Sequence, residues 1–164
     1  MALTTLHLAK QNFKFSAAHF LIFDDQHAEK LHGHNYQVKV DIVVPNEIEL
    51  HEKGFFIDFN VFKKHIKARL DQWDEVVLLP AGHRDMKITK KSPSLEVVFR
   101  DRFYVFPENE VVLLPITNTS VEQLSRILAE DFYENFKKYQ VKKVRVSVEE
   151  TRGQGAWTDA GEGL

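Results

Sequence analysis

Three histidines have the type and spacing of a metal site. His32 and His34 lie two residues apart, and on a β-strand that spacing directs both side chains to the same face. If the segment that ends at His19 pairs with them as a hairpin, three imidazoles converge. Three protein ligands with an open fourth position are typical of catalytic rather than structural zinc. The sequence therefore predicts a zinc ion held by His19, His32 and His34.

Ordinary surface histidine is the alternative interpretation, because the chain contains eight histidines and the hairpin is itself an inference. The chain has no cysteine, which excludes disulfides and thiolate nucleophiles and restricts a transition-metal site to imidazole and oxygen ligands. The histidines outside the group of three are interpreted as mostly surface residues: His7, His27, His51, His65 and His83.

The elements that must position these histidines follow from hydrophobic spacing. Residues 6–19 carry the two-residue alternation of a strand that ends near His19, and the alternation resumes over 34–42 before Pro45 stops it. Residues 20–33 between the two strands are expected to form a charged, histidine-rich loop.

Two amphipathic helices are predicted further along the chain. Apolar residues recur at helical spacing over 59–72, after Asp58 or Asn60 as a cap, and again from Ser120 to about Tyr139. Both helices would bury one apolar face against the sheet.

Three further segments are assigned from composition or from alternation. Residues 76–115 contain short β-prone pieces separated by proline and glycine and are expected to form an extra hairpin or two. Residues 144–150 alternate as a last strand whose apolar stripe terminates in Glu150. The glycine-rich tail, about 153–164, is expected to be mobile.

Length and charge limit the class of protein. The chain has 164 residues, of which 43% are hydrophobic, which is enough for one globular domain over residues 1–164. Its net charge of −2 and mixed charges give no footprint for nucleic acid or an anionic membrane. The N-terminus lacks a long apolar segment, and no apolar run approaches the roughly 20 residues of a membrane span. We expect a cytoplasmic protein with no nucleic-acid or membrane partner.

Five sequence motifs resemble those of the 6-pyruvoyltetrahydropterin synthase and 6-carboxytetrahydropterin synthase family. FSAAH and HGHNY look like its two histidine signatures, GFFIDF like the segment before its first helix, NTSVEQL like the opening of its second helix, and VEET like its pterin-anchoring strand end. These motifs occupy residues 15–19, 32–36, 54–59, 118–124 and 148–151.

The resemblance covers nearly the whole chain, with an insertion at about 80–111. It implies an α+β tunnelling fold: a four-stranded antiparallel sheet with two helices on one face, to which this chain adds an inserted hairpin region. It also implies trimers that stack into a homohexamer, a dimer of trimers, with active sites at subunit interfaces.

Residue by residue, the resemblance makes His19, His32 and His34 the zinc ligands and Glu150 the carboxylate that holds the amino-pyrimidine edge of a pterin. A buried glutamate needs hydrogen-bond donors, and a pterin offers paired N–H groups. Ser120 and Glu122 match positions of the substrate pocket, although a role in the first turn of a helix accounts for them equally well.

The chain departs from the family pattern at two catalytic positions. Ala28 stands where the usual synthases carry a cysteine, and the expected aspartate–histidine pair falls on Asp74 and Glu75. Glu29 gives the spacing ExxHGH, which looks like a variant branch that uses glutamate in place of cysteine and makes 6-hydroxymethyl-dihydropterin for folate. An ordinary solvated glutamate is the alternative, and His83 is a weaker substitute base.

The resulting hypothesis is a zinc-dependent lyase acting on 7,8-dihydroneopterin triphosphate, in pterin/folate or queuosine-related biosynthesis, with Glu29, Asp74 and Glu75 moving protons. The absence of the usual cysteine and histidine favours an alternative, a catalytically altered or inactive paralogue that binds zinc and a pterin. An unrelated metallohydrolase with three histidine ligands would require the family match to be accidental.

Overall fold

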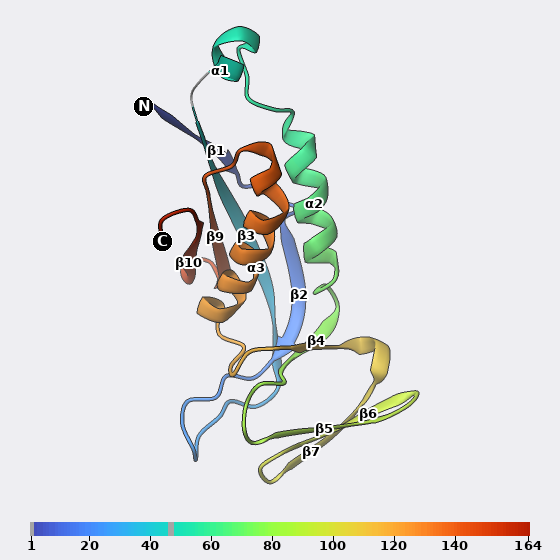
Figure 1. The fold of residues 1–164 in the computed structure, drawn as a ribbon. Helices are drawn as coiled ribbons and strands as arrows, with labels where there is room; N and C mark the ends of the chain where they lie inside the picture. Colours follow the sequence, from blue (N-terminus) through green and yellow to red (C-terminus); the bar gives the residue numbers. More distant parts are fainter. Residues whose placement is uncertain (1, 46–47) are drawn as a thin grey trace.

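A computed structural model describes residues 2–45 and 48–164 (Figure 1). The strands are β1 (Leu3–Leu8), β2 (Lys14–His19), β3 (His32–Pro45), β4 (Val76–Pro80), β5 (Met86–Lys91), β6 (Ser94–Phe99), β7 (Arg102–Pro107), β8 (Val111–Leu114), β9 (Lys143–Thr151) and β10 (Gln154–Gly161). The α-helices are α1 (Ile48–Lys53), α2 (Phe59–Asp71) and α3 (Val121–Phe136), and the 3₁₀ turns are η1 (Glu108–Glu110) and η2 (Lys137–Tyr139).

In the part of the chain that the structure describes, seven strands form one mixed sheet. Six of them lie side by side in the order β10-β9-β3-β2-β4-β8, and β1 pairs with β3 outside this order. The expected four-stranded, purely antiparallel sheet is wrong, because β4 runs parallel to β2 and β8 runs parallel to β4. Parallel neighbours need a long crossover connection, and the chain between β2 and β4 supplies one that includes α2.

The segment predicted as one strand over 6–19 is divided into β1 and β2. Both pair with the long strand β3, through Leu8↔Val40 and Lys14↔Gln37. The alternation of the segment survives this division, because Phe13 and Phe15 are buried beneath the helices while Lys14 is exposed.

The expected mobile tail is wrong for residues 154–161. They form β10, which pairs antiparallel with β9 and places Trp157 opposite Ser147. This pairing depends on glycine, since a Cβ on Gly155 would meet the carbonyl oxygen of Val148 at 2.3 Å. The glycine content of this segment therefore accompanies close strand packing.

Helices α2 and α3 lie over the same face of the sheet in Figure 1. The Asp58 carboxylate caps α2 by accepting a hydrogen bond from the Asn60 N–H, and Ser120 caps α3 through Gln123. Both helices are confirmed near their predicted limits. Their buried residues, including Phe62 and Leu128, join the inward residues of β3 in one apolar core. Among the described residues, no helix is both long enough and apolar enough to cross a membrane.

The inserted region forms a second layer beside one end of the sheet (Figure 1). Strands β5, β6 and β7 make a three-stranded antiparallel sheet, which corresponds to the expected extra hairpins. Its buried residues Leu95, Val97 and Phe99 pack against Phe20 and Ile22 in a core cluster of their own. The insertion thus supports the segment that directly follows His19.

Candidate metal centre and active site

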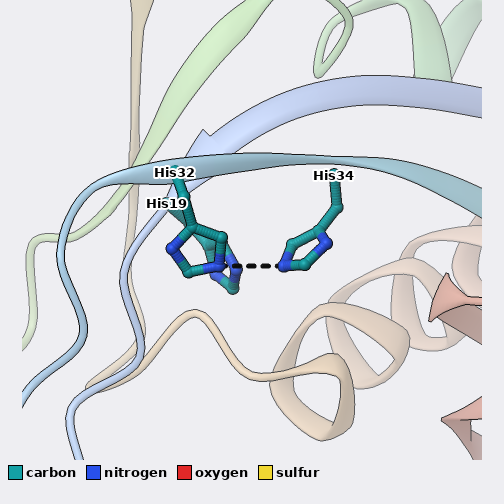
Figure 2. A group of neighbouring side chains, drawn as sticks. All are labelled: His19, His32 and His34. Atoms are coloured by element: carbon teal, nitrogen blue, oxygen red, sulfur yellow. Dashed lines mark hydrogen bonds between the residues drawn. The ribbon is translucent and has the colours of Figure 1, made fainter.

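Three imidazoles meet at one end of the β2–β3 pair. His19 is the last residue of β2 and lies directly opposite His32 in the strand register, while His34 lies opposite Ala17. The candidate ligand nitrogens of the three rings all lie within 4.8 Å of one another. Figure 2 shows the rings pointing toward one another from the same side of the two strands. The predicted hairpin therefore brings the three histidines together.

Backbone carbonyls fix two of the rings in one tautomer. His19 Nδ1 donates to the Thr119 carbonyl oxygen at 3.0 Å, and His32 Nδ1 donates to the Lys30 carbonyl oxygen at 2.7 Å. A carbonyl can only accept, so each Nδ1 carries the proton and each Nε2 keeps its lone pair. Metal-binding histidines usually donate their other ring N–H to a carbonyl or carboxylate in this way.

The Nε2 atoms fit a cation. His19 Nε2 is buried and has no hydrogen-bond partner among the described residues, which is costly unless a ligand satisfies it. The Nε2 atoms of His32 and His34 are 2.9 Å apart (Figure 2). With His32 fixed as the Nδ1–H tautomer, that contact needs a proton on His34 Nε2. A metal ion between the rings would take the place of this proton.

Burial keeps His19 in the neutral form that metal binding requires. His19 is 2% exposed, and desolvation by burial lowers its pKa to about 4 against the opposing effect of the Thr119 carbonyl. The neutral imidazole is then the dominant form at neutral pH, and no proton has to leave it before a cation binds.

Two carboxylates approach the imidazoles. Glu29 Oε2 lies 3.6 Å from His32 Nε2, and Glu150 Oε2 lies 3.9 Å from His34 Nε2. Glu29 is held in place because its Oε2 also accepts a hydrogen bond from the Leu21 N–H at 3.0 Å. Both side chains are partly buried. Two of the sequence-predicted acidic residues therefore lie beside the histidine cluster.

Comparison with known proteins decides the family. Residues 8–160 match the sequence model of a family described as "6-pyruvoyl tetrahydropterin synthase". The chain belongs to this family.

Curated relatives and solved structures agree with the assignment. The chain is 29% identical over 146 residues to a Methanocaldococcus jannaschii protein provisionally named 6-carboxy-5,6,7,8-tetrahydropterin synthase, covering 87% of each chain. A Pyrococcus abyssi protein with the same provisional name is 27% identical, over 82% of this chain and 78% of the relative.

The fold matches solved synthases closely. The 6-pyruvoyl tetrahydropterin synthase of Plasmodium vivax superposes with a TM-score of 0.87 and 25% identity, over 98% of this chain and 99% of that one. The Plasmodium falciparum enzyme gives the same TM-score at 24% identity and the same coverage. Further P. vivax structures, also at 24% identity and the same TM-score and coverage, are described as mutants in which a catalytic glutamate is replaced by alanine or cysteine.

Two residues that were not predicted as site residues contribute to the site. Thr119 is fully buried, and its carbonyl and Oγ1 both lie within hydrogen-bond distance of His19 Nδ1. Tyr36 is fully buried, and its hydroxyl has no hydrogen-bond partner in residues 2–45 and 48–164. Burial, reinforced by Glu150 and Glu29, raises the pKa of this hydroxyl. The only signal in the sequence is their place inside the NTS and HGHNY motifs.

The motif before α3 joins three parts of the site. The Asn118 side chain accepts from the Ile22 N–H and donates to the Ile22 carbonyl oxygen, Thr119 orients His19, and Ser120 caps the helix. Glu122 is exposed in the first turn. Ser120 and Glu122 therefore lie at the start of α3, and their role in substrate binding stays a prediction.

Asp74 and Glu75 lie away from the imidazoles. Asp74 Oδ1 accepts a hydrogen bond from the Ser16 N–H, and the Glu75 N–H donates to the Ser16 carbonyl oxygen. Ser16 is three residues before His19, or roughly 10 Å along the strand. Ser16 also faces away from the helices, beside a cavity of about 390 Å³ whose lining includes Glu75 and Asn35. His34 also borders this cavity. Among the described residues, however, no hydrogen bond or ion pair joins Asp74 or Glu75 to an imidazole of the cluster.

Proposed function

We propose that this protein is a zinc-dependent lyase that cleaves the side chain of 7,8-dihydroneopterin triphosphate to give 6-hydroxymethyl-dihydropterin. The observation that carries the proposal is the position of Glu29, whose carboxylate lies 3.6 Å from His32 Nε2 inside the histidine cluster. A carboxylate there can act as the general base that Ala28 cannot supply. The catalytic glutamate of the P. vivax protein supports the same role for Glu29.

Bound at His19, His32 and His34, zinc would polarise the side-chain oxygens of the substrate and acidify their protons. Glu29 would take the proton from the C2′ hydroxyl. As C2′ becomes an aldehyde, the C1′–C2′ bond breaks, the pterin ring accepts the electron pair, and C1′ is protonated. C1′ keeps its hydroxyl, and the triphosphate leaves on a two-carbon aldehyde, so all atoms are accounted for.

Glu150 would hold the amino-pyrimidine edge of the pterin. It ends the apolar stripe of β9, whose valines Val144, Val146 and Val148 are fully buried. A partly buried carboxylate at that point gains most from a ligand that offers two N–H donors. Its 3.9 Å separation from His34 Nε2 would bring the pterin's side chain to the histidine cluster.

Asp74 and Glu75 would act on the site of a neighbouring copy. Their distance from the histidines of their own chain supports a homo-oligomer with shared sites, for which we propose the hexamer of two trimers. We propose a cytoplasmic location and a small-molecule pterin substrate for this enzyme.

The direct test is to incubate the zinc-loaded protein with 7,8-dihydroneopterin triphosphate and to identify the products by mass spectrometry. The expected result is 6-hydroxymethyl-dihydropterin, with turnover reduced about 10²- to 10⁴-fold in Glu29→Ala while zinc remains bound. His27→Ala, an exposed change in the same loop, is the control.

Two other outcomes would replace the proposal. A 6-carboxy or 6-pyruvoyl product would keep the family activity and change the reaction. Tight binding of the substrate without turnover would indicate a pterin-binding paralogue, the alternative that Ala28 and Glu75 favour.

A further inference from the structure

The segment that carries Glu29 rests on the inserted sheet. Residues 20–31 connect His19 to His32, two of the three histidines, and this segment includes Glu29. Phe20 and Ile22 are buried in the same cluster as Phe99 of the insertion, and Ala28 and Leu31 pack against that cluster. A movement of the insertion would therefore displace the segment on which Glu29 lies.

One side chain of the insertion reaches the backbone at Glu29. Arg102, the first residue of β7, donates from Nη2 to the Ala28 carbonyl oxygen at 3.0 Å and from Nη1 to the Glu29 carbonyl oxygen. Its guanidinium lies over the rings of Phe20 and Phe99, 5.5 and 5.8 Å from their centroids. A planar guanidinium donates to two adjacent acceptors in a fixed geometry that a lysine ammonium does not reproduce.

Glu29 is constrained from three directions. Arg102 holds its carbonyl oxygen, the Leu21 carbonyl oxygen accepts from its N–H at 2.8 Å, and the Leu21 N–H donates to its carboxylate at 3.0 Å. The first two contacts fix the backbone from which the carboxylate projects. The third sets the carboxylate 3.6 Å from His32 Nε2.

We infer that Arg102 is a positioning residue for Glu29, and that the inserted sheet serves the reaction by fixing the loop between His19 and His32. This inference rests on the proposed role of Glu29 as the general base. Arg102 itself acts through the two carbonyls and does not touch the substrate. Misplacement of a catalytic group by about 1 Å can cost about 100-fold in rate.

The experiment compares the zinc-loaded variants Arg102→Gln and Arg102→Lys with the wild-type protein. We expect kcat to fall about 10- to 100-fold in Arg102→Gln, with KM and zinc content within about twofold and partial recovery in Arg102→Lys. The matched control is Arg84→Gln, because Arg84 pairs with Asp25 of the same loop through an exposed ion pair that contributes little. Arg84→Gln should keep wild-type kcat.

A double-mutant comparison separates positioning from general structural support. In a Glu29→Gln background, Arg102→Gln should cause no further loss of kcat, because the group that it positions has already been removed. Losses that multiply in the double variant would overturn the inference, as would wild-type kcat in Arg102→Gln. If Arg102→Gln does not fold, the same comparison is made with Arg102→Lys.

The control variant Glu29→Gln also distinguishes this inference from the proposed function. Full turnover in Glu29→Gln would reject both the proposed general base and the positioning role of Arg102. Loss of turnover in Glu29→Gln with no effect from Arg102 would leave the lyase proposal intact and reject the inference alone.

Discussion

The two faces of the β2–β3 pair carry different halves of the expected chemistry. The face covered by α2 and α3 presents His19, His32 and His34, with Glu29 and Glu150 within 4 Å of two of them. The opposite face presents Ser16 and Asn35, whose side chains are hydrogen-bonded to each other at 2.6 Å, beside Asp74 and Glu75.

The difference follows from strand geometry. Successive side chains of a strand point to opposite faces, so Ser16 and His19 cannot contribute to one site within the same chain. This separation is the reason for proposing that one copy supplies two half-sites. In that proposal a complete site combines the histidines of one copy with Asp74 and Glu75 of a neighbouring copy.

The largest expected effect is the loss of metal from the helix-covered face. His34→Ala should lose its zinc and lower turnover about 1000-fold, because a bound metal contributes several kcal/mol to transition-state stabilisation. Metal analysis by mass spectrometry and a turnover assay measure the two quantities. Zinc retained at one ion per chain would contradict the assignment, and His7→Ala on the exposed part of β1 serves as the control.

The pH dependence of stability in the metal-free protein should show that His19 is buried. Folding lowers the pKa of His19 from 6.5 to about 4. As the pH falls, the unfolded chain therefore binds a proton at His19 before the folded chain does. The contribution of His19 is fully present above pH 6.5 and is lost as the pH falls to 4, a change of about 3 kcal/mol in the free energy of unfolding.

Urea unfolding at several pH values measures this contribution as the difference between wild type and His19→Gln, which does not titrate. The two pH profiles should separate between pH 6.5 and 4. Parallel profiles would show that His19 is protonated freely in the folded state.

Asp74→Asn tests the opposite face. If Asp74 moves a proton, kcat should fall about 100-fold while zinc content stays unchanged, because Asp74 does not contact the imidazoles of its own chain. A loss of zinc would contradict the separation of the two half-sites. Asp71→Asn, an exposed change at the end of α2, is the control.

The smallest expected effect concerns the support of His19. Thr119→Val removes the hydroxyl that lies 3.2 Å from His19 Nδ1 but leaves the backbone carbonyl at 3.0 Å. We expect zinc affinity to fall about tenfold, at the low end for loss of a group behind a ligand. Competition with a chelator measures the change, and Thr117→Val on the exposed side of the same segment should leave it unaltered.

The sequence predicted the parts of the fold that depend on local spacing. Alternation located β3 and the inward face of β9, and helical spacing with a capping residue located α2 and α3. The prediction that the three imidazoles converge required only one further assumption, the strand pairing that places His19 beside His32. Glu29 was identified through its fixed distance from the HGH motif.

The remaining features depend on contacts between distant segments. β4 runs parallel to β2 after a crossover that includes α2, and β8 runs parallel to β4 after the inserted strands β5 to β7. The few residues of β4 and β8 carry no local pattern that shows these directions. The sequence of β10 has the glycine content of a mobile tail, and its strand structure depends on pairing with β9. Thr119 and Arg102 act on residues 100 and 73 positions away, and no local pattern indicates such contacts.

The most direct test of the shared site is complementation between two inactive variants. His34→Ala and Asp74→Asn, co-expressed with different tags and purified as mixed oligomers, should regain about a quarter of wild-type turnover, because one site in four then combines two intact halves. Mixed oligomers of His34→Ala and His32→Ala should stay inactive, since both changes affect the same half. No recovery in the first mixture would contradict a site built from two copies.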